Sequence, residues 1–441
     1  MNSVKWELTQ RCNLKCKHCF VGKIDYERDM EIDKAREMLK KMKASGVDEI
    51  VLSTKEPLAY PHICELLECC AELNLYVTLV TNGTLISDQV LRCLSLCKVK
   101  NLSVSLEGIS SETNDYVRGE GVFAKVLDAV KRVNELNYTT KYSFPLALQI
   151  SLTSKNYDEV GDMIDWFENS PFIAVNVGDI SILGNATENA DLKLTEKQYE
   201  KAVDILLESY SKLEEPSFVL NLKKSTPYDT LYLNMKYGLA MECVVPSCGA
   251  YHGYYSLLPN GDTCSCVALT DEVFSSYDNL RSDYNLLKDG IFENTTRISD
   301  LGKYKEDGFC KECRYKNECE LCLLIVYDDM RFEESRRKCK RAYELLEKNL
   351  ENIYLGKKKY RLNPYVFIYE QDEKMMLKKI SQTGTMNELD VTGSKECIRN
   401  LFLNKEYISI NSMMELEPEK RKKLVKELMY NDMLQVAKEE K

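Results

Sequence analysis

Three cysteines near the start of the chain have a spacing that suits a metal or an iron–sulfur cluster. Cys12, Cys16 and Cys19 form a C-x3-C-x2-C pattern, and a short apolar run that is typical of a strand precedes them. Thiolates are soft ligands that select zinc or iron–sulfur clusters. Three thiolates leave one iron of a four-iron cluster open to chelate a small molecule, whereas a zinc site needs a distant fourth ligand. Buried core thiols are a further alternative.

A second group of cysteines begins past the middle of the chain. In a reducing cytosol, clustered thiols bind metal or do redox chemistry more often than they form disulfides. Two C-x2-C pairs within this group could hold one structural zinc ion by spacing alone. The group consists of Cys243, Cys248, Cys264, Cys266, Cys310, Cys313, Cys319, Cys322 and Cys339.

The composition narrows the classes of protein to consider. The chain has 441 residues, of which 44% are apolar and 29% charged, as in globular proteins of two to four domains. A formal net charge of −10 argues against a general nucleic-acid or anionic-membrane surface. No apolar run could span a membrane, and the first residues lack the apolar stretch of a signal peptide. We therefore expect a cytoplasmic protein with neither a membrane nor a nucleic-acid partner.

Strand-like and helical patterns alternate over the first half of the chain. Repeated strand–helix units of this spacing predict a parallel sheet with helices outside. Six or more units favour a complete or partial barrel, with a doubly wound open sheet as the alternative. The predicted strands are 4–8, 49–53, 76–81, 101–106, 147–153, 173–177 and 218–222. The predicted helices are 31–44, 63–73, 88–96, 122–136, 158–167 and 195–212.

The cysteine triplet after a first strand resembles that of the radical S-adenosylmethionine (radical SAM) superfamily, and the resemblance extends over residues 1–225. It implies a partial (β/α)6 TIM-like barrel with its site at the C-terminal ends of the strands. It also implies that Cys12, Cys16 and Cys19 hold a [4Fe–4S] cluster. That cluster would cleave SAM reductively to a 5′-deoxyadenosyl radical.

The same resemblance implies a set of SAM contacts at the ends of successive strands. Ser53-Thr54-Lys55-Glu56-Pro57 stands where the family has Gly-Gly-Glu-Pro, so the two glycines that allow close backbone approach are replaced. The expected SAM ligand of this motif is Glu56, which would hold the ammonium group. The remaining expected contacts are Asn82, Ser105, Glu107, Arg118 and Asn185. No catalytic acid or base is assigned.

The order of the later cysteines resembles the SPASM extension of peptide-modifying radical SAM enzymes, which carries two auxiliary [4Fe–4S] clusters. The resemblance implies three clusters in all, with Cys264 as an alternative ligand of the first auxiliary cluster. The cysteine pattern departs from the family between Cys319 and Cys322, where two residues intervene and the family usually has three. The first auxiliary cluster would be held by Cys243, Cys248, Cys266 and Cys322, and the second by Cys310, Cys313, Cys319 and Cys339.

From residue 360 a small strand–strand–helix–helix pattern begins, which resembles the winged-helix-like PqqD leader-recognition domain of ribosomal peptide maturases. That module more often precedes the radical SAM domain. A helical cap and a DNA-binding domain are alternatives, but 17 basic against 14 acidic residues from Lys357 onward are too mild a balance to predict duplex binding. The predicted domains are 1–225 (barrel), 226–345 (SPASM), 346–359 (helix end and linker) and 360–441 (peptide recognition).

These resemblances imply a peptide maturase that abstracts a hydrogen atom from a ribosomally made precursor, most simply to install a cross-link. Its partners would be that peptide and an electron donor such as flavodoxin or ferredoxin. Thioether formation, epimerisation and sulfatase maturation are alternatives. Sulfatase-maturing enzymes have an Asp after the auxiliary-cluster cysteine, where this chain has Val267 after Cys266. The alternative of another class is a metal-stabilised peptide- or DNA-binding protein.

Overall fold

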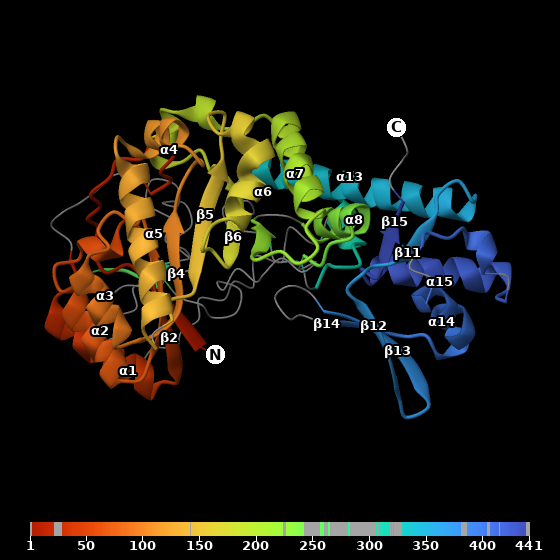
Figure 1. Cartoon of the computed structure of the whole chain (residues 1–441), viewed down its shortest axis with the longest axis horizontal. Coiled ribbons are helices and arrows are strands. Elements are labelled where there is room, and N and C mark those ends of the chain that lie inside the picture. The colour runs from red at the N-terminus through yellow and green to blue at the C-terminus, as the bar shows by residue number, and fades with distance from the viewer. Residues whose placement is uncertain are drawn as a thin grey trace. The chain divides into compact units, whose positions relative to one another are not determined.

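The structure is a computed structural model of the whole chain (Figure 1). Contacts divide the chain into two compact units: Met1–Lys223 with Cys248–Leu301, and Lys224–Ser247 with Gly302–Lys441. The finer division into four domains stays a prediction. The structure describes residues 2–21, 29–141, 143–223, 226–241, 256–259, 263–264, 281–282, 306, 308–317, 319, 321, 329–380, 386–403, 406–413 and 415–437.

The first unit is built on one ten-stranded sheet with the order β10-β9-β8-β1-β2-β3-β4-β5-β6-β7. Strands β1 to β7 are parallel and lie in sequence order, and β8 pairs with β1 in parallel. Their bounds are β1 Asn2–Trp6, β2 Val47–Leu52, β3 Tyr76–Thr81, β4 Lys98–Ser105, β5 Leu146–Leu152, β6 Ala174–Asp179, β7 Val219–Leu222, β8 Ser256–Leu257, β9 Thr263–Cys264 and β10 Arg281–Ser282.

The strand order decides between the two expected architectures. Right-handed crossovers between neighbouring parallel strands place every connecting helix on the same side of the sheet. A doubly wound sheet instead reverses its strand order at a switch point, and β1 to β7 show no reversal. Strand β8 extends the sheet on the other side of β1, and the strand order ends at β7 and β10, as in a partial barrel that does not close. The expected α/β fold with a partial barrel is therefore confirmed.

The helices of this unit pack as neighbouring pairs along the outside of the sheet: α1 with α2, α2 with α3, α4 with α5, and α6 with α7. Figure 1 shows α1, α2, α3 and α5 side by side along the strands. Helix α4 was not predicted. The bounds are α1 Ile32–Ala44, α2 Ile63–Glu72, α3 Asp88–Ser95, α4 Ser111–Arg118, α5 Val122–Thr139, α6 Val160–Glu168 and α7 Glu196–Tyr210.

The second unit combines helices with two small antiparallel sheets, β11-β15 and β12-β13-β14. The predicted strand pair and the two helices after it are present, and β14 adds a third strand that was not predicted. The bounds are α8 Pro227–Tyr237, α11 Gly308–Lys311, α13 Asp329–Tyr354, β11 Tyr360–Leu362, β12 Val366–Gln371, β13 Lys374–Ile380, β14 Met386–Asp390, α14 Lys395–Leu403, α15 Pro418–Tyr430 and β15 Leu434–Val436.

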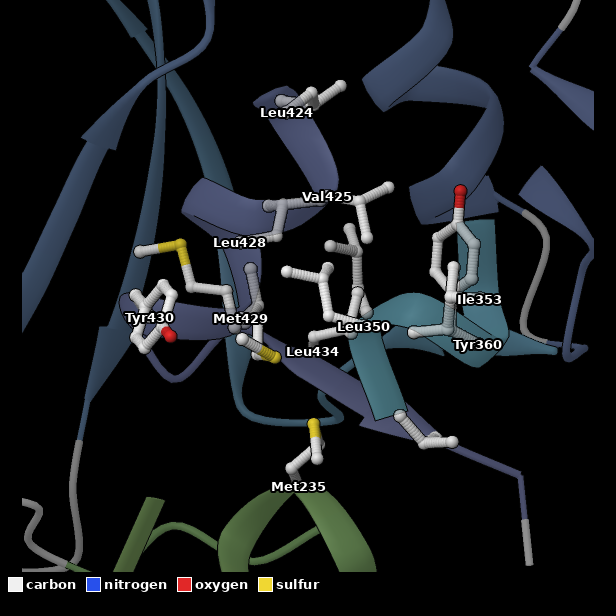
Figure 2. Packing of buried hydrophobic residues seen from close by; sticks show 14 of the residues in the cluster. Met235, Leu350, Ile353, Tyr360, Leu424, Val425, Leu428, Met429, Tyr430 and Leu434 are labelled. Atoms are coloured by element: carbon white, nitrogen blue, oxygen red, sulfur yellow. The ribbon is translucent and has the colours of Figure 1, made fainter. Parts of the chain in front are cut away.

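One hydrophobic core joins the early and late parts of the second unit. Met235 of α8, Leu350 and Ile353 of α13, and Val425 and Leu428 of α15 all belong to it. Figure 2 shows these side chains pointing toward one another around β11 and β15. Each of the five is nearly or fully buried, so the free energy of unfolding of this unit depends on all three helices together. Within the described ranges, no helix is long and apolar enough to cross a membrane.

Candidate functional site

The cysteine loop leaves the C-terminal end of β1 and is fixed to two other parts of the first unit. Its three thiol residues are all half-buried. The amide of Lys17 donates to the carbonyl of Val117 in α4 at 2.9 Å. Asn185 donates from its backbone to the Cys19 carbonyl at 2.9 Å and from Nδ2 to the Cys16 carbonyl at 3.1 Å. Asn185 therefore holds the loop in place, in addition to any contact that it makes with SAM.

The thiols of the loop lie close enough to influence one another. Burial raises the pKa of Cys16 to about 11, and although Arg118 opposes the rise, Cys19 and Cys12 add to it. Burial also raises the pKa of Cys12, with Glu56 and Cys19 among the contributing charges. Such thiols ionise only when a cation or cluster stabilises the thiolates. No three Cys, His, Asp or Glu side chains in the described part of the chain are arranged to hold a single metal ion.

Glu56 lies at the centre of the adjoining strand ends and is fully buried. Its Oε1 accepts hydrogen bonds from the Thr81 hydroxyl at 2.7 Å and the Leu58 amide at 3.0 Å. Its Oε2 accepts from the Asn82 amide at 2.7 Å. Burial raises the pKa of Glu56, and these three donors oppose the rise. The carboxylate thus ties the end of β2 to the end of β3, and its contact with SAM stays a prediction.

The two residues that replace the family glycines keep a glycine-like backbone. Thr54 has φ 76° and Lys55 has φ 50°, both in the left-handed region. L-residues in that region are strained, and β-branched ones such as threonine most of all. The Thr54 hydroxyl is also buried without a hydrogen-bond partner among the described residues. The backbone conformation that glycine favours is therefore retained at these positions, at a cost in conformational energy.

Thr54→Gly is expected to stabilise the first unit by about 1 kcal/mol, because glycine relieves the left-handed strain and removes an unsatisfied hydroxyl. The measurement is the thermal unfolding midpoint of the cluster-loaded protein, followed anaerobically by circular dichroism. The matched control is Asn74→Gly, since Asn74 has φ 56° and asparagine tolerates this region. An equal or larger rise in the control would contradict the strain at Thr54.

Glu107 and Arg118 form a buried ion pair of 2.7 Å between the end of β4 and the end of α4. His18, from the cysteine loop, approaches the same carboxylate oxygen with Nε2 at 2.9 Å. The amide of Ser151 donates to the other oxygen at 2.6 Å. Burial alone would raise the pKa of Glu107, but His18, Arg118 and the Ser151 amide lower it to about 2. The carboxylate is therefore ionised throughout the physiological range.

Several donors around this pair are buried without a hydrogen-bond partner among the residues that the structure describes. They are Arg118 Nε, His18 Nδ1 and Ser53 Oγ. Buried donors of native proteins are almost always satisfied, so each such atom calls for an explanation. An anionic or polar ligand beside the loop would satisfy them. The residues present thus fit a bound amino acid such as the methionine part of SAM.

The other expected contacts are brought to the same end of the sheet. Asn82 follows β3, and its Nδ2 donates to Asn13 of the cysteine loop at 2.9 Å. Ser105 ends β4 and is half-buried. Sequence reasoning missed His18, although its place between two cysteines was a signal. It also missed Glu7, which directly follows β1; burial raises the pKa of this carboxyl to about 7, and Lys55 and Lys5 oppose the rise.

In the second unit, the four cysteines predicted for the second auxiliary cluster line one cavity. Cys310 and Cys313 lie in one turn, in which the Cys313 amide donates to the Cys310 carbonyl at 3.2 Å. Burial raises the pKa of Cys339, which comes from α13. The lining residues are Thr226, Pro227, Phe309, Cys310, Cys313, Lys316, Cys319, Leu321, Phe332, Ser335, Arg336 and Cys339. Soft thiols around one cavity with apolar neighbours are suited to an iron–sulfur cluster.

The first auxiliary cluster lies outside the described part of the chain. Its four expected ligands, Cys243, Cys248, Cys266 and Cys322, are not among the described residues. The alternative ligand Cys264 is described only as a member of β9. Their assignment stays a prediction from the resemblance.

Known proteins resemble this chain in sequence and in fold. Residues 6–166 match the family described as the radical SAM superfamily. A curated relative, the AdoMet-dependent heme synthase of Methanosarcina barkeri, is 26% identical over 337 residues, which cover 74% of this chain and 91% of the relative. Another relative is the mycofactocin maturase MftC of Mycolicibacterium smegmatis, which is 24% identical over 328 residues. The match covers 71% of this chain and 76% of MftC.

The fold is shared with a solved structure of Streptococcus suis SuiB bound to S-adenosylmethionine. The TM-score is 0.56 at 17% identity, and the likeness covers 73% of each chain. The structure of SuiB bound to its precursor peptide SuiA gives a TM-score of 0.55 at the same identity. The likeness covers 73% of this chain and 72% of that SuiB chain. At 17% identity, these two likenesses show a shared fold.

Proposed function

The chain contains a radical SAM domain over residues 6–166 and is a radical SAM enzyme, and from this premise we propose that it modifies a ribosomally made precursor peptide. The observation that carries the proposal is the cavity lined by Cys310, Cys313, Cys319 and Cys339 in the second unit. A four-thiol site there suits the auxiliary cluster of peptide-modifying members. The relatives named for peptide maturation and the SuiB structure with a precursor peptide support the same substrate class.

In this proposal Cys12, Cys16 and Cys19 hold the first [4Fe–4S] cluster, and SAM lies against Glu56, Asn82, Ser105, Glu107, Arg118 and Asn185. Together, the cluster and SAM supply a 5′-deoxyadenosyl radical that removes a hydrogen atom from the peptide. The chain supplies the binding and orientation. The NH2 group of Arg118 is held by Glu107, and its buried Nε, which has no partner among the described residues, would donate to the ligand. Asn185 fixes the cysteine loop through two hydrogen bonds.

The proposal includes two auxiliary clusters and an external electron donor such as flavodoxin or ferredoxin. Eight later cysteines would complete two four-thiolate sites, which hold clusters without an open iron. A closed cluster can accept an electron but cannot coordinate a substrate thiolate. We therefore favour cross-linking through carbon over thioether formation, with a product that retains its cysteine thiols. Cys243 as the fourth ligand of the first auxiliary cluster is the basis of this preference.

A second candidate substrate is a tetrapyrrole, because one curated relative, which this chain covers over 91% of its length, is named a heme synthase. The two substrates are separated by the amount of 5′-deoxyadenosine formed in the presence of each. With reduced enzyme and SAM, the peptide encoded by a short reading frame beside the gene is expected to raise this amount at least about tenfold. Coproporphyrin III is expected to leave it at the level without substrate. The reverse result would replace the peptide by a tetrapyrrole.

We further propose that the three-stranded sheet of the second unit binds the leader of the precursor by strand addition. Such addition supplies backbone hydrogen bonds along an exposed sheet edge. The edges are β12 and β14. Arg399 of α14 pairs with Glu370 at the β12 edge, so we place the added strand beside β14.

Glu388→Pro is expected to abolish modification of the precursor. The amide of Val391 donates to the carbonyl of Met375 in β13. In an antiparallel pair, every second residue points its amide toward the partner strand. The amides of residues 387 and 389 therefore also face β13. The amide of Glu388 therefore faces outward, and proline there removes a donor from the edge without breaking the ladder. The measurement is modified precursor by mass spectrometry.

The matched control is Glu388→Ala, which loses the same side chain and keeps the amide. Modification at the normal rate in the proline variant would contradict strand addition at β14. Removal of everything after Gly356 is a poor test, because it would also remove Val425 and Leu428 from the core that covers α8 and α13.

A further inference from the structure

A row of carboxamide side chains crosses the inner face of the barrel. Gln149 of β5, Asn176 of β6 and Asn221 of β7 are neighbours in the strand register. All three are half-buried, while the residues next to them in sequence, such as Leu148 and Val175, are fully buried. Since successive side chains of a strand point to opposite faces, the buried residues face the outer helices and the carboxamides face inward.

Small residues flank the row on both sides along the strands. Ala147 and Ala174 are register partners two residues before Gln149 and Asn176, on the same face. Ser151 and Gly178 are register partners two residues after them. The amides of Gln149 and Asn176 therefore project above a floor of short side chains, and the Lys223 side chain lies over Gly178 at one end of that floor.

The hydrogen bonds along the row leave part of its capacity for a ligand. Asn221 Nδ2 donates to Asn176 Oδ1 at 3.3 Å, and Asn176 Nδ2 donates to the Leu148 carbonyl at 3.5 Å. Both bonds are at the long limit for an N–H···O contact. Gln149 Nε2 donates to Ser103 Oγ at 2.7 Å, and Lys223 donates to Gln149 Oε1. Each carboxamide offers two donors and one oxygen with two lone pairs, so Asn176 and Asn221 can exchange long bonds for shorter ones.

We propose that Asn176 and Asn221, supported by Gln149, bind the backbone of the substrate peptide in the barrel. A carboxamide carries the same donor and acceptor pair as a peptide group, so it bonds a peptide backbone whatever the side chains are. Strands are ~4.8 Å apart, so the three carboxamides span roughly 10 Å, about three residues of an extended chain. The inference rests on the proposed peptide substrate and adds the residues that hold it.

The row suits a peptide better than a tetrapyrrole. A porphyrin presents two broad apolar faces, which apolar walls bind well. Neutral carboxamides at half-buried positions would lose hydrogen bonds to water against an apolar ring without replacing them. Against a peptide backbone, the carboxamides form a new hydrogen bond for each bond to water that they lose.

The test uses a fluorescent, capped random-sequence nonapeptide library and the same library with every backbone nitrogen methylated. Binding to the cluster- and SAM-loaded full chain is measured by fluorescence anisotropy. The wild type is expected to bind the unmethylated library at least about fivefold more tightly, because methylation removes the backbone donors. Asn176→Leu and Asn221→Leu, which keep the number of side-chain heavy atoms and the branch at Cγ, are expected to lose that preference. Gln89→Leu, an exposed amide on α3, is expected to keep it.

The outcomes separate this inference from the proposed function. Iron content and the thermal midpoint show whether the leucine variants fold. A preference for the unmethylated library that persists in both folded variants overturns the carboxamide row and leaves the peptide substrate standing. If the wild type binds neither library and binds coproporphyrin III, the proposed function fails together with the row.

Discussion

Replacement of Cys12, Cys16 and Cys19 by alanine together is expected to abolish SAM cleavage and to leave the iron of the second unit bound. The three thiols belong to one loop after β1, while Cys310, Cys313, Cys319 and Cys339 line a cavity of the other compact unit. After anaerobic reconstitution, the wild type is expected to hold about twelve iron and twelve sulfide per chain, and the variant about eight of each. SAM cleavage is measured as 5′-deoxyadenosine by chromatography after reduction with dithionite.

The matched control replaces Cys64, Cys69 and Cys97, which lie on or next to α2 and α3. It removes the same number of thiols and is expected to keep all clusters and SAM cleavage. Iron near four per chain in the wild type, accompanied by zinc, would contradict the auxiliary clusters. Loss of all iron in the alanine variant would show that the clusters do not load independently.

Much of the first unit could be predicted from the sequence, because its strands are short apolar runs between amphipathic helices. Strand β3 has the predicted bounds, and α1 differs from its predicted range by one residue. Helix α4 was missed because its eight residues, SETNDYVR, show little apolar periodicity. A signal was present, since the Ser110 side chain caps the amide of Thr113 at the start of that helix.

Helix α8 was missed for a different reason. Its first residue is Pro227, and Thr226 forms a capping box with Asp229, which together mark a helix start. Both signals lie next to residue 225, the predicted end of the barrel, after which the sequence predicts a cysteine-rich domain. The buried residues of α8 face α13 and β15, far away in sequence, so its role in the core could not be predicted from local pattern.

For the candidate site, the sequence indicates which strand ends carry polar residues but not how these residues pair. Glu56 was expected to face SAM, and its carboxylate already accepts three hydrogen bonds from neighbouring strand ends. The contact between His18 and Glu107 joins residues from the loops that follow β1 and β4, which are far apart in sequence. The left-handed backbone of Thr54 and Lys55 likewise has no signal in the two residue types, which rarely adopt it.

Arg118→Ala is expected to weaken SAM binding at least about tenfold, through loss of the donor that we propose binds the ligand, and to destabilise the first unit. Removal of one partner of a buried ion pair costs about 3–5 kcal/mol, and the remaining contacts of Glu107 with His18 and the Ser151 amide place Arg118→Ala at or below the lower end of this range. Both effects arise because Arg118 pairs with Glu107 through NH2, while its Nε is buried and has no partner among the described side chains. SAM affinity is measured by calorimetry on the cluster-loaded protein, and stability by its thermal midpoint.

The double variant Glu107→Gln with Arg118→Ala separates these two roles, with Glu107→Gln alone as the reference. Glutamine removes the buried charge, so the thermal midpoint of the double variant is expected to recover most of the loss caused by Arg118→Ala. SAM affinity is expected to stay at least about tenfold below that of Glu107→Gln alone, because the guanidinium that we propose pairs with the SAM carboxylate is still missing. Recovery of affinity together with stability would mean that Arg118 only neutralises Glu107. Arg118→Lys, which keeps the charge and loses the planar fork, is expected to be stable and to bind SAM with intermediate affinity.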